Sequence, residues 1–93
     1  MKILGKQLTA TAVAAEVKVN CQRLLLTNDG ESTIYLSIEL VEDYPETVVA
    51  DADSYFPLGA GEVLSLESEA RFTSVNYICA AGQTSYLRIA AWR

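Results

Sequence analysis

The segment TIYLSIEL, Thr33 to Leu40, contains the clearest strand pattern in the chain. Every second side chain is a branched aliphatic one, at Ile34, Leu36, Ile38 and Leu40. The positions between them carry Thr33, Tyr35, Ser37 and Glu39. Because successive side chains of a strand point to opposite faces, the segment predicts a strand with one buried and one solvent-facing side.

Turn-forming residues lie on both sides of this segment. Asn28-Asp29-Gly30-Glu31 precedes it, and these residue types tolerate positive φ, so they predict a hairpin that pairs Arg23–Thr27 with Thr33–Leu40. Further along, FPLGAGEVLSLES from Phe56 to Ser68 places Pro57 before Gly59-Ala60-Gly61. This predicts a firm reversal into a strand whose Leu64 and Leu66 point inward, in a register where a one-residue slip would expose both.

The last third of the chain predicts two more strands, Val75–Ala80 and Tyr86–Trp92, with a turn between them and Glu69–Ser74 as a connection before them. In the final strand one face carries Leu87, Ile89 and Ala91, and the other carries Tyr86, Arg88, Ala90 and Trp92. At the other end of the chain, Leu8–Asn20 mixes alanines with β-branched residues, and we predict a strand there. Val41–Ser54 is predicted as a long acidic loop that holds a short strand at Thr47–Ala50.

The expected architecture is all-β: a single antiparallel β-sandwich of jelly-roll type, or a small barrel, over residues 1–93. Residues 1–20 are expected as either an N-terminal arm or an edge strand. The chain is 51% apolar and 20% charged, which is ordinary for a packed domain. No apolar run approaches the roughly 20 residues of a membrane span, and Lys6 interrupts the apolar start before it could form a signal-peptide core.

An enzyme is not expected, because the chain contains no histidine and so lacks the commonest general base and a usual member of zinc sites and nucleophilic triads. The glycines at Gly59 and Gly61 form no phosphate-binding motif. The acidic loop could supply oxygen ligands for calcium, but its spacing matches no EF-hand. No cofactor and no metal site are predicted. Cys21 and Cys79 are expected as reduced core residues, with a disulfide as the alternative.

Charge is segregated along the chain, whose net charge is −5. Between Leu24 and Ala70 there is no lysine or arginine, whereas basic residues flank this block on both sides. Two readings stay open: an acidic and a basic pole, or a mixed surface once the chain is folded. Nucleic-acid binding is not expected, since the aromatic residues in the middle of the chain lack basic neighbours.

Three stretches resemble the small β-structured virion proteins encoded beside the capsid genes of tailed bacteriophages: LLLTNDGESTIYLSIE, YFPLGAGEVLSLES and NYICAAGQTSYLRIAAW. The matching turn residues are Asn28 and Gly30, then Pro57, Leu58, Gly61 and Glu62, then Ala80, Gly82 and Thr84. The resemblance implies a non-enzymatic capsid decoration (cement) protein of the virion, assembled in the host cytoplasm. It also implies a homo-oligomer, with a trimer favoured, whose partners are the major capsid protein or other virion proteins.

The expected contacts combine basic residues with outward aromatic rings, because rigid aromatic side chains make good interface anchors. These candidate interface residues are Lys2, Lys6, Lys18, Tyr35, Tyr86, Arg88, Trp92 and Arg93. The acidic loop from Glu42 to Asp53 is expected to face solvent. The alternative function is a neck, tail or head-fibre component that recognises a glycan or a protein through its tyrosines and Trp92.

Overall fold

The computed structural model describes residues 2–40 and 56–92, so the predicted acidic loop and the short strand at Thr47–Ala50 lie outside it. The described residues form strands and turns, with no helix among them. The strands are β1 (Lys2–Ala10), β2 (Ala15–Asn28), β3 (Ile34–Leu40), β4 (Phe56–Leu58), β5 (Val63–Cys79) and β6 (Ser85–Trp92). The prediction of an all-β chain is confirmed.

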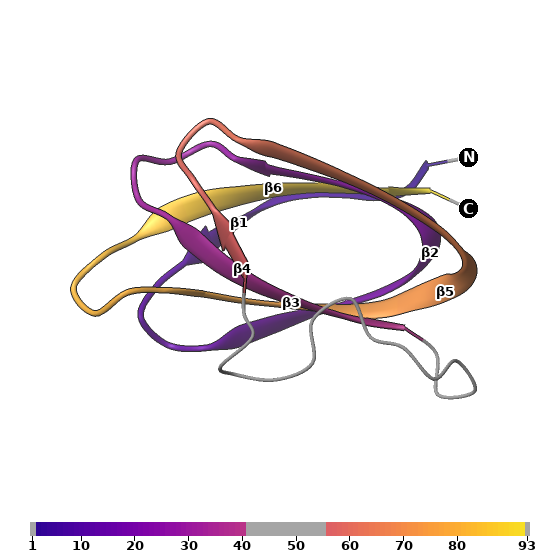
Figure 1. Ribbon diagram of the computed structural model, residues 1–93, viewed down its shortest axis with the longest axis horizontal. Coiled ribbons are helices and arrows are strands. Elements are labelled where there is room, and N and C mark those ends of the chain that lie inside the picture. Colours follow the sequence, from indigo (N-terminus) through magenta and orange to yellow (C-terminus); the bar gives the residue numbers. More distant parts are fainter. Residues whose placement is uncertain (1, 41–55, 93) are drawn as a thin grey trace.

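The strands form one antiparallel sheet in the order β1-β6-β2-β5-β3-β4. Its pairing is nested: the first strand pairs with the sixth, the second with the fifth and the third with the fourth. Two further pairings, β2 with β6 and β3 with β5, join these pairs into a continuous sheet. The sheet curls into a half-barrel (Figure 1), which agrees with the predicted small barrel or sandwich.

Strands β2 and β5 bend together, at the right of Figure 1, and so belong to both layers of the curled sheet. Lys18 lies opposite Ser74, whereas Arg23 lies opposite Glu67, so β2 advances five residues (18 to 23) while β5 covers seven (67 to 74). Such bulges bend a strand and increase its twist. We call this region, residues 18–23 and 67–74, the bend end. The opposite region, with the connections 11–14, 29–33, 59–62 and 80–84, is the turn end.

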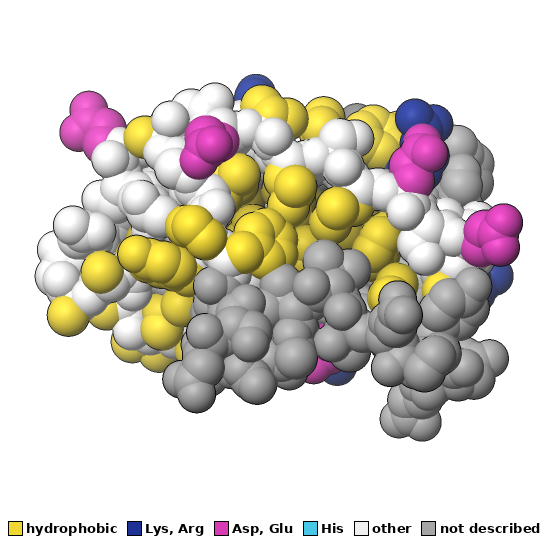
Figure 2. Space-filling model, in the orientation of Figure 1, with side chains coloured by type: hydrophobic (Ala, Val, Ile, Leu, Met, Phe, Trp, Pro, Cys, Tyr) yellow, Lys and Arg dark blue, Asp and Glu magenta, His cyan; other side chains and the backbone are white. Residues whose placement is uncertain are grey.

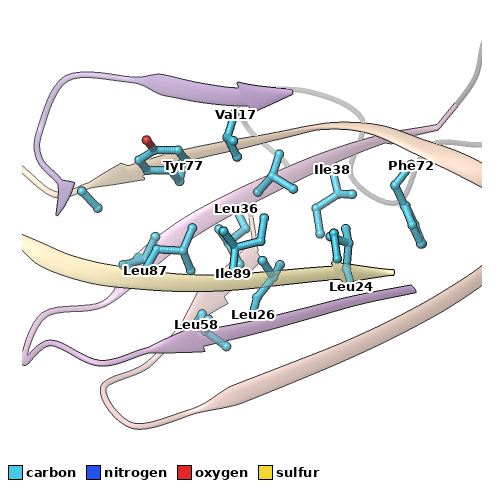
Figure 3. Close-up of a cluster of buried hydrophobic side chains, with 14 of the residues drawn as sticks. Val17, Leu24, Leu26, Leu36, Ile38, Leu58, Phe72, Tyr77, Leu87 and Ile89 are labelled. Atoms are coloured by element: carbon cyan, nitrogen blue, oxygen red, sulfur yellow. The ribbon is translucent and has the colours of Figure 1, made fainter. Parts of the chain in front are cut away.

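The hydrophobic core lies between the two layers and contains side chains from every strand (Figure 3). Ile34, Leu36 and Ile38 are fully buried, as the alternation predicts, and so are Leu87 and Ile89. Leu64 and Leu66 also pack against the core, partly buried. Figure 2 shows hydrophobic side chains across the middle of one side of the molecule, within the ring of strands that Figure 1 draws. Partly buried residues around the core include Leu8, Val19, Leu40 and Phe56.

The predicted hairpin between Arg23–Thr27 and Thr33–Leu40 is wrong, because β5 lies between β2 and β3. The segment 29–33 instead crosses from one layer to the other. Glu69–Ser74 is not a connection either: β5 runs unbroken from Val63 to Cys79 and bends there. The predicted strand within Leu8–Asn20 is divided between β1 and β2, with a break at residues 11–14.

Asn28 explains why its segment does not form a hairpin turn. The side chain is fully buried, and its Nδ2 donates to the carbonyl oxygens of Ser32 at 2.7 Å and Leu58 at 2.8 Å. Its Oδ1 accepts hydrogen bonds from the Gly30 amide at 3.0 Å and the Ser85 hydroxyl at 2.6 Å. These bonds satisfy the whole amide group and tie three connections of the turn end together.

Glycines serve two different purposes at this end. A Cβ on Gly30 would overlap Ser85 Oγ and lie 2.8 Å from the Tyr86 nitrogen, so Gly30 allows two backbone segments to approach closely. Gly61 and Gly82 instead have φ of 78° and 77°, a region that residues with a Cβ rarely adopt. The firm reversal predicted after Pro57 is confirmed at residues 59–62.

Candidate interaction surface

One side of the curled sheet presents a broad exposed face, which we call the outer face. It consists of the outward side chains of β1, β6 and the adjoining parts of β2 and β5. Because directly opposite residues of antiparallel strands point to the same side, the register gives its rows. One row is Gln7, Arg88, Thr27 and Val63, and the next is Gly5, Ala90, Leu25 and Ser65. Thr9 and Tyr86 lie beyond the first, and Trp92, Arg23 and Glu67 beyond the second.

Apolar groups are prominent on the outer face. Val63 and Tyr86 are two of the three large hydrophobic residues that the described part of the chain exposes, at 59% and 49%. Trp92, Leu25 and Ala90 are half-buried, so each still presents part of its side chain. The aromatic rings lie at opposite ends of β6, and of the two rows between them the one with Gly5 and Ala90 is uncharged. Exposed aromatic and aliphatic groups around a small-residue centre are typical of surfaces that bind other proteins.

The charges of this face are paired with one another. Arg23 Nε lies 2.8 Å from Glu67 Oε1, and Arg88 Nε lies 3.3 Å from Asp29 Oδ2. Both arginines and Glu67 are largely exposed, and Asp29 is partly buried, so the pairs contribute little to stability. They fix the direction of two long side chains and leave the centre of the face without an unpaired charge. Each pair joins a basic residue to the central acidic block, so in the described residues the segregated charges mix on folding.

A hollow lies on this face above the β1–β6 backbone. Gly5 and Ala90, which oppose each other across the two strands, line it together with Gln7, Arg88 and Asp29. The small side chains at the first two positions leave the space, and the longer ones border it. No acid–base or nucleophilic arrangement faces the hollow. Its border does offer hydrogen-bond donors from Gln7 and Arg88 to a side chain inserted from outside.

The structure separates the predicted contact residues into groups. Tyr86, Arg88 and Trp92 lie together on the outer face. Tyr35 lies on the opposite layer, between Pro57 and Ile78, and is half-buried. Lys18 also belongs to that layer, where its Nζ lies 3.6 Å from Glu16 Oε1.

The remaining predicted residues lie on β1 or outside the described part. Lys6 lies opposite the buried Ile89, so it points to the core side of the sheet, yet it is exposed. Lys2 pairs with Trp92 through the backbone. Arg93 lies outside the described residues.

Sequence reasoning did not include Arg23, Leu25 and Val63 in this surface. The alternation of Leu24 and Leu26 with their neighbours could have indicated that Arg23 and Leu25 point outward. The alternation of Leu64 and Leu66 with their neighbours gave the same signal for Val63, but its place beside Thr27 follows only from the pairing of the two strands.

Both cysteines are buried free thiols, as expected. Burial raises the pKa of Cys21 and Cys79, and a backbone hydrogen bond from Arg23 acts in the opposite direction on Cys21. The Cys79 thiol lies 3.6 Å from the Ala10 carbonyl oxygen. Thiols with a raised pKa are poor nucleophiles, so neither has the character of a catalytic cysteine.

The described residues contain no group of three or more histidine, cysteine, aspartate or glutamate side chains placed to hold a metal ion. Among them there is also no helix long and apolar enough to cross a membrane.

Comparison with known proteins adds no relative. No protein-family model matches the chain, and a search of the curated proteins finds no match.

Proposed function

We propose that this chain is a non-enzymatic assembly subunit, a capsid decoration protein of a tailed bacteriophage, that attaches through its outer face. Two observations support the proposal. The turn residues that carry the resemblance include Asn28, Gly30 and Gly61, which meet at the turn end and hold the connections in place. The exposed outer face then offers a binding surface supported by this rigid frame.

The composition of the outer face is the observation that carries the proposal. Tyr86, Arg88 and Trp92, all expected as contacts from the sequence, lie on one strand and point to the same side. Tyrosine, tryptophan and arginine are the residues that most often dominate protein–protein binding energy. Several of their neighbours on the face, such as Gly5, Leu25 and Val63, are small or apolar, and both arginines of the face are paired with carboxylates. Such a surface favours a protein partner over nucleic acid.

A small binding surface can stabilise a capsid shell if many copies of it bind at once. A chain with 93 residues can bury only a modest area against each neighbour. On a capsid lattice, however, each oligomer engages several identical sites, and linked weak contacts act with a high effective concentration. A trimer placed on a three-fold position would use three copies of the outer face at once. The function proposed is mechanical: each oligomer bridges neighbouring capsid subunits and resists internal pressure.

Binding to phage heads that lack this chain tests the proposal. Heads are mixed with the wild-type chain and with Tyr86→Ser and Trp92→Ser, and occupancy is read from sedimented particles. Both variants are expected to reduce occupancy strongly, whereas Lys18→Ser on the opposite layer is expected to leave it unchanged. Lys18 is a suitable control because it is exposed and ion-paired, like Arg88, but lies on the part of β2 that pairs with β5 and not with β6.

Two results would contradict the proposal. Full occupancy by both aromatic variants would show that the chain does not attach through the outer face. A loss of occupancy confined to Lys18→Ser would favour contact through the basic residues instead. The oligomeric state is measured separately by light scattering at low and high salt. A trimer is the expected result, and a monomer at every salt concentration would shift the proposal toward a recognition module.

A further inference from the structure

Among the described strands, β1 has a partner on only one of its two backbone edges. It is the outermost strand of the described sheet and pairs with β6 alone. Gly5, Lys6, Gln7 and Thr9 are all exposed, so the middle of the strand is accessible to a partner. In an antiparallel pair, alternate residues direct their N–H and C=O groups away from the neighbouring strand. Those groups form a ready template for another strand.

The charges of β1 select what can pair with this edge. Its charged residues, Lys2 and Lys6, are both positive. Lys6 has no ion-pair partner among the described residues, although other exposed cations such as Lys18 and Arg23 do. It also points to the core side of the sheet, because it lies opposite Ile89. An inward-pointing lysine on an edge strand disfavours uncontrolled strand pairing and leaves a positive charge for a matching anion.

A second copy of β1 is disfavoured at this edge in the two registers that align its lysines. In an antiparallel self-pair centred on Lys6, the two Lys6 side chains would lie directly opposite each other. A pair centred on Leu4 would place Lys2 opposite Lys6 in both copies. Like charges directly opposite each other destabilise a strand pair. A glutamate or aspartate at the same position would instead form a cross-strand ion pair with Lys6.

We propose that the free edge of β1 binds an extended acidic segment of a partner protein by strand addition. Backbone hydrogen bonds to β1 supply the affinity, and the pairing of Lys6 with an acidic side chain supplies the selectivity. The site is distinct from the outer face, since strand addition uses the backbone edge and leaves Tyr86 and Trp92 uncovered. The inference goes beyond the proposed function and does not require that the chain decorates a phage head.

Amide hydrogen exchange on the full chain tests this binding. The probe is a synthetic nine-residue peptide that alternates threonine and valine and carries glutamate at two threonine positions. Its twin carries lysine at the same positions, and a third peptide has the glutamates and N-methylated alternate amides. The acidic peptide is expected to protect β1 amides and to bind about tenfold more tightly than the lysine twin at low salt. The N-methylated peptide is expected to give no protection.

Substitution of Lys6 makes the test specific. Lys6→Glu is expected to invert the preference between the two peptides, and Lys6→Ala is expected to abolish it. The proposal would be overturned by protection of β4 instead of β1, by equal binding of both peptides, or by no protection at millimolar peptide. The proposal would also be contradicted if Lys6→Ala made the chain self-associate while the wild type bound neither peptide. Lys6 would then only prevent strand pairing at this edge.

Discussion

The two ends of the half-barrel are stabilised in opposite ways. At the turn end, a fully buried side chain, Asn28, makes four hydrogen bonds, two within the segment 29–33 and two to Leu58 and Ser85. At the bend end, Ser74 donates to Glu39 Oε2 at 2.7 Å in a partly buried position, but the side-chain contacts between β2 and β5 lie at the surface. Gln22 Nε2 donates to the Glu69 carbonyl at 2.8 Å, and Arg71 Nη1 lies 3.4 Å from Asn20 Oδ1. Water can replace a partner in the second case but not in the first.

This difference shows where the fold is specified and where it tolerates change. The turn end determines which strands become neighbours, because its connections carry the chain from layer to layer. The bend end only has to turn two strands that are already paired, and bulges do so with many side chains. Loss of the buried polar contacts at the first end should therefore be costly, and loss of a surface polar contact at the second should be mild.

The largest expected effect comes from Asn28→Ala. It leaves the carbonyl oxygens of Ser32 and Leu58 and the hydroxyl of Ser85 without their partner inside the protein. We expect a loss of about 3–5 kcal/mol in the free energy of unfolding, measured by urea titration. Gln22→Ala at the bend end is the matched control, with an expected loss of about 0.5 kcal/mol. Similar losses for the two variants would contradict the contrast between the ends.

Gly30→Ala is expected to cost somewhat less, about 3 kcal/mol in the same titration. The added methyl group would overlap Ser85 and the backbone of Tyr86, so two segments must separate. Gly59→Ala is the control, because its Cβ would meet only the end of the flexible Glu62 side chain. A Gly30→Ala chain as stable as the control would show that the turn end can relax and is less rigid than its hydrogen bonds indicate.

Gly82→Ala is expected to cost about 1 kcal/mol. Here nothing lies within 4 Å of the added Cβ, and the cost arises from the positive φ alone. Thermal unfolding of Gly82→Ala beside Gly30→Ala would thus separate backbone strain from steric overlap within one end of the molecule. Equal shifts in the two melting temperatures would argue against that separation.

The smallest effect at neutral pH concerns the thiols, Cys21 at the bend end and Cys79 near the turn end. Burial raises the pKa of both above their ordinary value of 9.0. Each thiol keeps its proton to a higher pH in the folded chain than in the unfolded chain. Its contribution to stability is therefore fully present below the unfolded pKa and is lost as the pH rises through the folded pKa. The free energy of unfolding should therefore decrease above about pH 9. In Cys79→Ala the free energy of unfolding should decrease less steeply with pH. An unchanged slope would show that the Cys79 thiol does not cause the decrease.

The strand faces were predictable because their signal is local. Alternation alone placed Ile34, Leu36 and Ile38 in the core, and Tyr86, Arg88 and Trp92 outside it. Asn28-Asp29-Gly30 has the local pattern of a hairpin turn, and only its bonds to Leu58 and Ser85, far away in the sequence, show a different role. The unbroken course of β5 did have a signal, since Glu67–Thr73 contains neither glycine nor proline. The rows of the outer face depend on register and could not be inferred.

The nested pairing has a consequence for how the molecule folds. Lys2 lies beside Trp92, so the outermost pair joins residues from opposite ends of the described chain, whereas β3 and β4 close a much shorter loop. Short loops lose less entropy on closing, and contacts between distant residues form slowly. The β1–β6 pair is therefore expected to form late. A partner that recognises the row of Gly5 and Ala90 would bind only chains in which this pair has formed. Assembly would therefore incorporate only fully folded subunits.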